Sequence, residues 1–138
     1  MIWKALEIAQ AKDFVSEMED GLDSHVEQGG GNFSGGQRQR LAIARALVKT
    51  ADIYVFDDSF SALDFKTDAN LRQALKTNMK ESITVLVAQR VSTVMDADMI
   101  LVLDEGKLVG KGTHEELLAT NETYQEIVHS QLREEDLA

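Results

Sequence analysis

The sequence predicts an α/β fold with a largely parallel sheet and flanking helices. Two observations support this. Segments whose apolar residues recur at helical spacing alternate with short, continuous apolar segments at 52–57 and 83–88. The second of these, ITVLVA, is apolar almost throughout, which is typical of a strand buried on both faces of a parallel sheet.

Composition excludes several classes of function. The net charge of −10, from 24 acidic and 14 basic residues, argues against a general nucleic-acid binder, because little basic surface is available to neutralise phosphates. The absence of cysteine excludes disulfides and thiolate metal sites, and is compatible with the cytosol. No apolar run approaches the ~20 residues that cross a bilayer, so any membrane role would come through a partner or a further segment.

The first third of the chain is expected to be helical. Residues 2–20 predict one or two helices, and the glycines and asparagine of 21–32 predict a loop. Residues 34–51 predict a helix that begins near Ser34 or Gly35. The side chains expected to face inward on this helix are Leu41, Ala44, Ala46 and Leu47.

Between and after the two strands, the pattern again predicts helices. Residues 64–82 predict an amphipathic helix, and residues 91–97 predict a short one. On the longer helix, one apolar stripe is expected to contain Leu71, Leu75 and Met79.

The last third predicts a hairpin followed by helix. Residues 99–113 predict the hairpin, with Asp104-Glu105-Gly106 as its turn. One or two helices should follow to the end of the chain. Thr113 is the expected N-cap, and Glu116 would complete a capping box.

The stretch Ser34-Gly35-Gly36-Gln37 predicts an anion site. Two glycines at a helix start allow close backbone approach, and the free N–H groups there favour a phosphate, to which the Ser34 hydroxyl adds a donor. The alternative is an ordinary N-cap on a core helix.

Two aspartates end the predicted strand IYVFD. In P-loop nucleotidases an aspartate at the end of a buried strand holds Mg²⁺, usually through its waters, and Asp57 fits that role. The next acid, Asp58, would orient the attacking water. For Asp58 taken alone, a turn or helix cap is the competing interpretation.

In this order, the motifs resemble the C-terminal part of the nucleotide-binding domain of an ABC transporter of the multidrug-exporter type. The resemblance covers nearly all of the chain. FSGGQRQRLAIARAL (33–47) is similar to the family's signature motif, which is highly specific at this length. The other matching stretches are IYVFDD (Walker B), Ser61-Ala62-Leu63-Asp64 (D-loop), 86–118 (switch strand and tail) and EQGGGNF (the loop that faces the membrane domains).

The resemblance implies a partial P-loop NTPase-like domain in two parts. Residues 1–51 would form the helical subdomain with the signature, and residues 52–138 the C-terminal part of the ATPase core. The implied ligands are ATP and Mg²⁺. Ser34, Gly35, Gly36 and Gln37 would act in trans on ATP bound by a second ABC ATPase domain, and Asp64 would lie at the dimer interface and couple the two sites.

Two residues depart from the family's pattern. Asp58 stands where the family usually has Glu, and Gln89 where it usually has His. The shorter carboxylate lies farther from the phosphate, and a neutral amide cannot become cationic, so both changes weaken catalysis. Together they resemble the degenerate half of a heterodimeric exporter; the alternative is a homodimer in which Asp58 still acts as a poorer base.

The Walker A lobe is missing, because no GxxxxGK[ST] motif occurs in the sequence. We therefore expect these residues to be a piece of a longer subunit, binding ATP weakly and not hydrolysing it alone. Trp3 is expected to pack and Tyr54 to lie in the core, so neither should replace the family's base-stacking aromatic.

Other polar groups predict little chemistry. The histidines 25, 114 and 129 lack ligand spacing, and His114 is expected in the first turn of a helix. Arg38, Arg40 and Arg45 are expected to form salt bridges and pack their stems. The acidic stretch 126–138 is expected to be a solvated helix.

The leading functional hypothesis is thus an ATPase subunit that powers export at the cytoplasmic face of a membrane, joined to transmembrane domains and a second ATPase domain, without nucleic acid. One alternative is a soluble ABC-type ATPase of DNA repair, although no coiled-coil insertion precedes the signature. The other is a catalytically weak, regulatory nucleotide-binding module. The transported substrate cannot be predicted, because its specificity lies in membrane helices absent from this sequence.

Overall fold

The computed structural model describes the backbone of residues 1–137 and the side chains of residues 1–133. Ala138, the last residue of the predicted part 52–138, lies outside the described residues, as do the side chains of residues 134–137 in the predicted acidic stretch 126–138. The chain divides into two compact units, residues 1–88 and 89–138. The predicted division at 51/52 is a functional one and stays a prediction.

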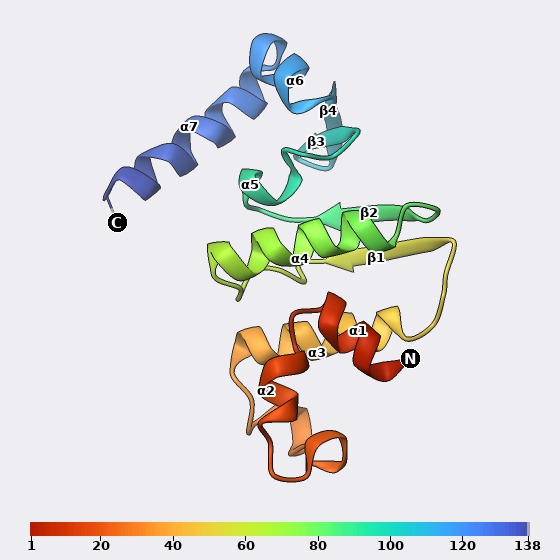
Figure 1. Ribbon diagram of the computed structural model, residues 1–138. Coiled ribbons are helices and arrows are strands. Elements are labelled where there is room, and N and C mark those ends of the chain that lie inside the picture. The colour runs from red at the N-terminus through yellow and green to blue at the C-terminus, as the bar shows by residue number, and fades with distance from the viewer. Residues whose placement is uncertain (138) are drawn as a thin grey trace. The chain divides into compact units, whose positions relative to one another are not determined.

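The first unit begins with three helices joined by turns (Figure 1). Of the one or two helices predicted for residues 2–20, the structure has two, α1 (Ile2–Ile8) and α2 (Lys12–Ser16). The predicted loop contains two short 3-10 turns, Gly21–Asp23 and Gln28–Gly30. The helix α3, which carries the predicted signature residues, spans Gly35–Leu47.

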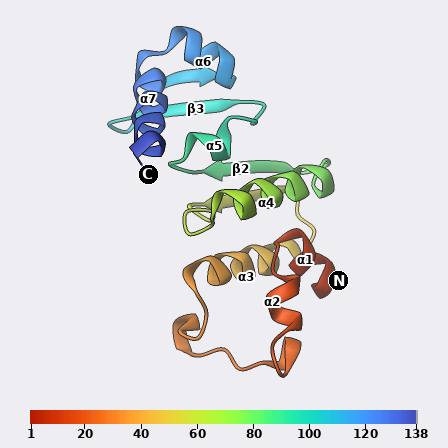
Figure 2. The same ribbon diagram turned by 60° about the vertical axis from the view of Figure 1, so that its left-hand side comes forward.

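A parallel pair of strands follows, as predicted. β1 (Ile53–Asp57) pairs with β2 (Ile83–Val87), with Ile53 opposite Ile83. The crossover between them is α4 (Phe65–Asn78), which runs alongside both strands in the two ribbon views (Figures 1 and 2). The helix ends four residues earlier than predicted, because the chain turns at Met79, whose φ and ψ are no longer helical.

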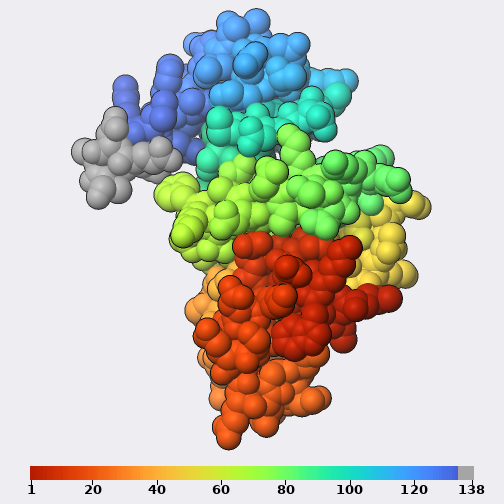
Figure 3. Space-filling view, in the orientation of Figure 1, coloured from red at the N-terminus to blue at the C-terminus, as the bar shows by residue number. Residues whose placement is uncertain are grey.

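The core of the first unit lies between one face of this sheet and the helices. Tyr54 and Phe56 of β1 pack with Leu71 and Leu75 of α4 and with Ile43 of α3. α1 also packs directly against α4, as the space-filling view shows (Figure 3).

Two burial predictions are wrong. Ala46 is exposed, because the buried face of α3 runs through Ile43 and Ala44, and Ala46 lies outside it. β2 is not buried on both faces, because the core packs against one face of the β1–β2 pair and the side chains on the other face are exposed. The apolar side chains left exposed on one face of the pair are Ile53, Val55, Ile83, Val85 and Val87.

The second unit starts with the short helix α5 (Val91–Val94). The predicted hairpin is confirmed: β3 (Ile100–Asp104) pairs antiparallel with β4 (Lys107–Gly112). Glu105 and Gly106, both with positive φ, form the two-residue turn.

Two helices complete this unit. α6 (His114–Thr120) begins at the predicted N-cap, and the Thr113–Glu116 capping box is present. α7 (Glu122–Leu137) follows, and its Tyr124 packs with Ile100, Val102 and Leu117. Over the part of the chain that the structure describes, no helix has both the length and the apolar character to cross a bilayer.

Candidate functional site

The first turn of α3, where the sequence predicts an anion site, begins with a capping box. The Ser34 hydroxyl accepts a hydrogen bond from the Gln37 N–H at 3.1 Å, and the Gln37 side-chain oxygen accepts one from the Ser34 N–H at 2.9 Å. This capping box satisfies the Gln37 donor and fixes the helix start. The preceding N–H groups of Gly35 and Gly36 have no acceptor within the helix and are the donors left for an anion.

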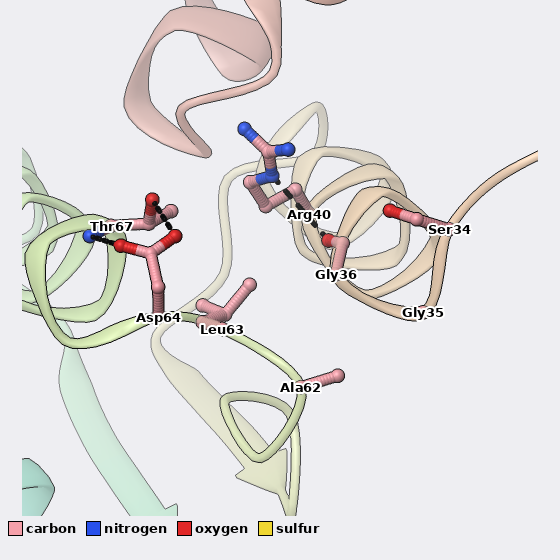
Figure 4. A pocket seen from close by; sticks show the side chains of 8 residues that line it. All are labelled: Ser34, Gly35, Gly36, Arg40, Ala62, Leu63, Asp64 and Thr67. Carbon is pink, nitrogen blue, oxygen red and sulfur yellow. Dashed lines mark hydrogen bonds between the residues drawn. The ribbon is translucent and has the colours of Figure 1, made fainter.

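A hollow of about 340 Å³ lies beside this helix start. Figure 4 shows the segment Ala62-Leu63-Asp64 facing the first turn of α3 across the hollow. The structure therefore brings the predicted signature and D-loop residues together within one chain. The lining residues are Ser34, Gly35, Gly36, Arg40, Ala62, Leu63, Asp64 and Thr67.

Glycine at position 36 permits the close approach of the two segments. A Cβ on Gly36 would lie 3.0 Å from the carbonyl oxygen of Ala62, whereas a Cβ on Gly35 would lie 3.4 Å from the Ala62 Cβ, an ordinary contact. The second glycine of the signature is thus explained by packing against the D-loop as well as by anion access.

Asp64 caps the next helix, α4. Its carboxylate accepts from the Thr67 N–H at 2.9 Å and from the Thr67 hydroxyl at 2.7 Å (Figure 4). These hydrogen bonds to Thr67 lower the pKa of Asp64 below its ordinary 3.8. Asp64 is exposed and therefore carries a negative charge at the rim of the hollow at neutral pH.

Arg40 lines the hollow and ties α3 to the N-terminal helices. Its guanidinium donates to the Gln10 carbonyl at 2.6 Å and lies 4.8 Å from the ring centroid of Phe14. Burial lowers the pKa of Arg40 from its ordinary value, while the charge of Asp64 acts in the opposite direction; the side chain stays cationic at neutral pH.

Asp57 and Asp58 lie at the carboxyl end of β1, and both are exposed. Asp58 has a φ of 50°, in the left-handed region, and its N–H donates to the Val87 carbonyl at 2.9 Å. This bond continues the parallel pairing by one residue past the strand. Gln89, the other predicted catalytic residue, belongs to the second unit, where its carbonyl accepts from Gln131 at 2.6 Å.

Gln39 is a residue that sequence reasoning missed. Its side-chain nitrogen donates to the Asp58 carbonyl at 3.1 Å and to the Ser61 hydroxyl at 2.9 Å. Its side-chain oxygen accepts from the Ala62 N–H at 2.8 Å. A signal was present: position 39 lies four and three residues after the two glycines, on the same face of the helix.

The arginine prediction needs a correction. Arg38 donates to the carbonyls of Gly30 and Phe33, and Arg40 donates to those of Gln10 and Gly36, so both bind backbone oxygen instead of forming the expected salt bridges. The reason is local: the loop before α3 and the end of α1 present carbonyls within reach.

His114 does lie in the first turn of a helix, as expected. Its Nδ1 lies 2.8 Å from the hydroxyl of the buried Tyr124. Within the described residues, no three His, Cys, Asp or Glu side chains cluster closely enough to hold a metal ion by themselves.

Comparison with known proteins identifies similar sequences. A family model described as ABC transporter matches residues 5–61. An uncharacterized ABC transporter ATP-binding protein of Mycobacterium tuberculosis is 52% identical over 130 residues, which are 94% of this chain and 22% of that protein. An ATP-dependent lipid A-core flippase of Pseudomonas fluorescens is 47% identical over 123 residues, 89% of this chain and 20% of the flippase.

A solved structure is similar in fold as well. The structure of a bacterial Atm1-family ABC exporter with ATP bound superposes with a TM-score of 0.91 at 37% identity. The match covers 95% of this chain and 23% of that one. The chain thus spans about a fifth of the length of the curated relatives it matches.

Proposed function

Because this chain is part of the nucleotide-binding domain of an ABC transporter and is homologous to ABC exporters, we propose that it takes part in ATP hydrolysis that drives export across a membrane. One observation carries the proposal: the capped first turn of α3 and the D-loop face one shared hollow, with two aspartates at the end of the neighbouring strand.

The chain contributes to two ATP sites in this proposal. Ser34, Gly35 and Gly36 complete the site of a second ABC ATPase domain, to which the Gly35 and Gly36 N–H groups offer donors for phosphate oxygens. Asp57, Asp58 and Gln89 belong to the chain's own site.

The chain's own site is proposed to be degenerate. The Asp58 carboxylate is one methylene shorter than glutamate, and the Gln89 amide cannot carry a positive charge. Each change weakens the positioning of water or the stabilisation of transferring phosphoryl oxygen. Together, Asp58 and Gln89 favour a heterodimer. In it, hydrolysis occurs mainly at the site that this chain's signature residues complete. Retained hydrolysis with Asp58 as a poorer base is the competing outcome.

The residues present fit Mg²⁺ as the metal that accompanies ATP. Mg²⁺ takes oxygen ligands, keeps several waters and uses one or two carboxylates together with substrate phosphates. Among the described side chains, no group of three could hold a metal ion by itself. A single exposed carboxylate at the end of β1 matches the donor set of an ion that also binds water and phosphate. Asp57 would hold the ion, and the ion would neutralise phosphate charge.

The proposed partners are a second ABC ATPase domain and the transmembrane domains of an exporter, at the cytoplasmic face of a membrane. The loop 27–33 would face the membrane domains. Support comes from the exporter relatives, whose lengths exceed this chain severalfold. Residues 1–138 alone, which contain no Walker A motif, are proposed to bind ATP weakly, which calorimetry with Mg²⁺–ATP would measure.

Steady-state ATPase of the complete subunit, alone and with its neighbouring ABC subunit, tests the proposal. Little activity alone and robust activity together would support a degenerate site beside a working one. Robust activity alone would show that Asp58 and Gln89 suffice and would replace the heterodimer with a homodimer. If ATP hydrolysis is absent under both conditions, a regulatory nucleotide-binding module becomes the better description.

A further inference from the structure

Gln39 connects α3, whose first turn is proposed to serve the partner's ATP site, to residues 58–62, which begin with the proposed catalytic Asp58. It lies on α3, one turn beyond the glycines of the signature, and its amide group makes three hydrogen bonds to residues 58–62. Two of them go to backbone atoms, the Asp58 carbonyl oxygen and the Ala62 N–H, so they restrain the path of the chain itself.

The restrained segment begins with an unusual conformation. Asp58 is a non-glycine residue at a φ of 50°, which costs conformational energy unless the surroundings hold it. Two described bonds do so from opposite sides: the Asp58 N–H donates to Val87 on the neighbouring strand, and the Asp58 carbonyl accepts from Gln39. The direction in which the Asp58 carboxylate leaves the backbone is set between them.

The same amide also fixes the D-loop. Its oxygen holds the Ala62 N–H at 2.8 Å, and the Ala62 carbonyl is the atom against which Gly36 packs. The hydroxyl of Ser61 accepts from Gln39 and donates to the Asp58 carbonyl at 3.3 Å, which closes a small network. The three hydrogen bonds of the half-buried Gln39 amide restrain its side chain and the residues that it binds.

We propose that Gln39 is a positioning residue for ATP hydrolysis, which holds Asp58 and the D-loop in register with the signature helix so that the chain's contributions to the two ATP sites move as one body. The inference rests on the proposed function. It assigns a role outside the residues that contact nucleotide, because none of the three bonds involves the Gly35 or Gly36 donors.

The role predicts a specific kinetic change. Without the amide, the D-loop and the Asp58 backbone can shift relative to α3, while the capping box of Ser34 and Gln37 stays intact. Displacements of about 1 Å in a catalytic group cost up to about a hundredfold in rate. We expect Gln39→Ala to lower kcat about tenfold and to leave KM for ATP within about twofold.

Three variants of the complete subunit, assembled with its partner, make the test. Gln39→Ala removes all three bonds. Gln39→Glu keeps the acceptor for the Ala62 N–H and removes the donor to Asp58, and it serves if the alanine variant folds poorly. Gln73→Ala is the matched control, since Gln73 lies on the exposed face of α4, away from the network.

Hydrogen exchange gives a readout that does not depend on activity. The Ala62 amide should exchange faster in Gln39→Ala and remain slow in Gln39→Glu and Gln73→Ala, while kcat falls in both Gln39 variants only. Unchanged kcat in both, or a rise in KM without a fall in kcat, would overturn the positioning role. No ATPase activity in the unmutated assembly would instead overturn the proposed function, whatever the exchange data show.

Discussion

The guanidinium of Arg40 lies over the ring of Phe14, with 4.8 Å between Cζ and the ring centroid. The same group donates at 2.6 Å to the carbonyl of Gln10, a residue with a φ of 58° between α1 and α2. One side chain thus connects α3 to the N-terminal helices through a cation–π contact and a charged hydrogen bond.

Replacing Arg40 by lysine should destabilise the first unit. An ammonium group keeps the charge and can reach one carbonyl, but it loses the guanidinium contact over the Phe14 ring and the second donor to Gly36. We expect a loss of about 1–2 kcal/mol in the free energy of unfolding. Chemical denaturation measures it, with the exposed Arg45→Lys as the control, for which no change is expected.

The contact between Gly36 and Ala62 leads to a second prediction. A methyl group at position 36 would meet the Ala62 carbonyl at 3.0 Å, so the D-loop must move, at a cost of about 1–3 kcal/mol. Gly35→Ala meets only an ordinary contact at 3.4 Å and gains helix propensity. Thermal unfolding should therefore show a lower Tm for Gly36→Ala than for Gly35→Ala. Equal values for the two variants would mean that the D-loop yields freely.

Asp64 predicts a dependence of stability on pH. Hydrogen bonds from Thr67 lower its pKa below 3.8, so the folded state binds this proton less readily than the unfolded state. The stabilisation is present above pH 3.8 and is lost as the pH falls through the lower folded value. Asp64→Asn keeps a cap without a titrating group. The Tm advantage of the wild type over this variant should shrink below about pH 4, and an advantage that stays constant down to acid pH would contradict the assignment.

The pKa of Tyr124 is shifted in the opposite direction, so its contribution to stability should be lost at alkaline pH. Burial raises the pKa of Tyr124 above 10, because the ionised phenolate would lose its hydration. The neutral form is favoured in the fold, so its stabilisation is complete below pH 10 and is lost as the pH rises through the folded value. The difference in tyrosinate absorbance between wild type and Tyr124→Phe should have its midpoint above 10. At neutral pH the variant should lose about 1 kcal/mol, because His114 loses its partner.

Local sequence patterns predicted much of this fold, because helix caps and turns are formed by interactions between residues close in the sequence. The helix start near Ser34, the capping box of Thr113 and the turn at Glu105-Gly106 each depend on a few neighbouring residues, and all are present. The parallel pairing of β1 with β2 was predicted from the alternation of helices and strands, and it is present as well. The roles of the site residues stay predictions, since they require nucleotide and a second domain.

The contacts that the sequence did not predict join residues far apart along the chain. Gln39 and Ala62 are separated by 23 residues, and Arg40 and Gln10 by 30, so no periodicity links them. The burial of β2 on both faces was predicted from its continuous apolar run, whereas the core of the unit packs against one face of the β1–β2 pair only. The apolar sequence of β2 makes the strand suited to burial, but the elements that pack against it in the structure determine which of its side chains are exposed.

The apolar face of the β1–β2 pair also has a practical consequence. Ile53 stands opposite Ile83 and Val55 opposite Val85, all of them exposed and without an intervening charge. β-branched residues in register on a strand surface are a template for self-association. A preparation limited to these 138 residues should therefore show concentration-dependent scattering despite its charge of −10, and single lysine substitutions at Val55 or Val85 should suppress it.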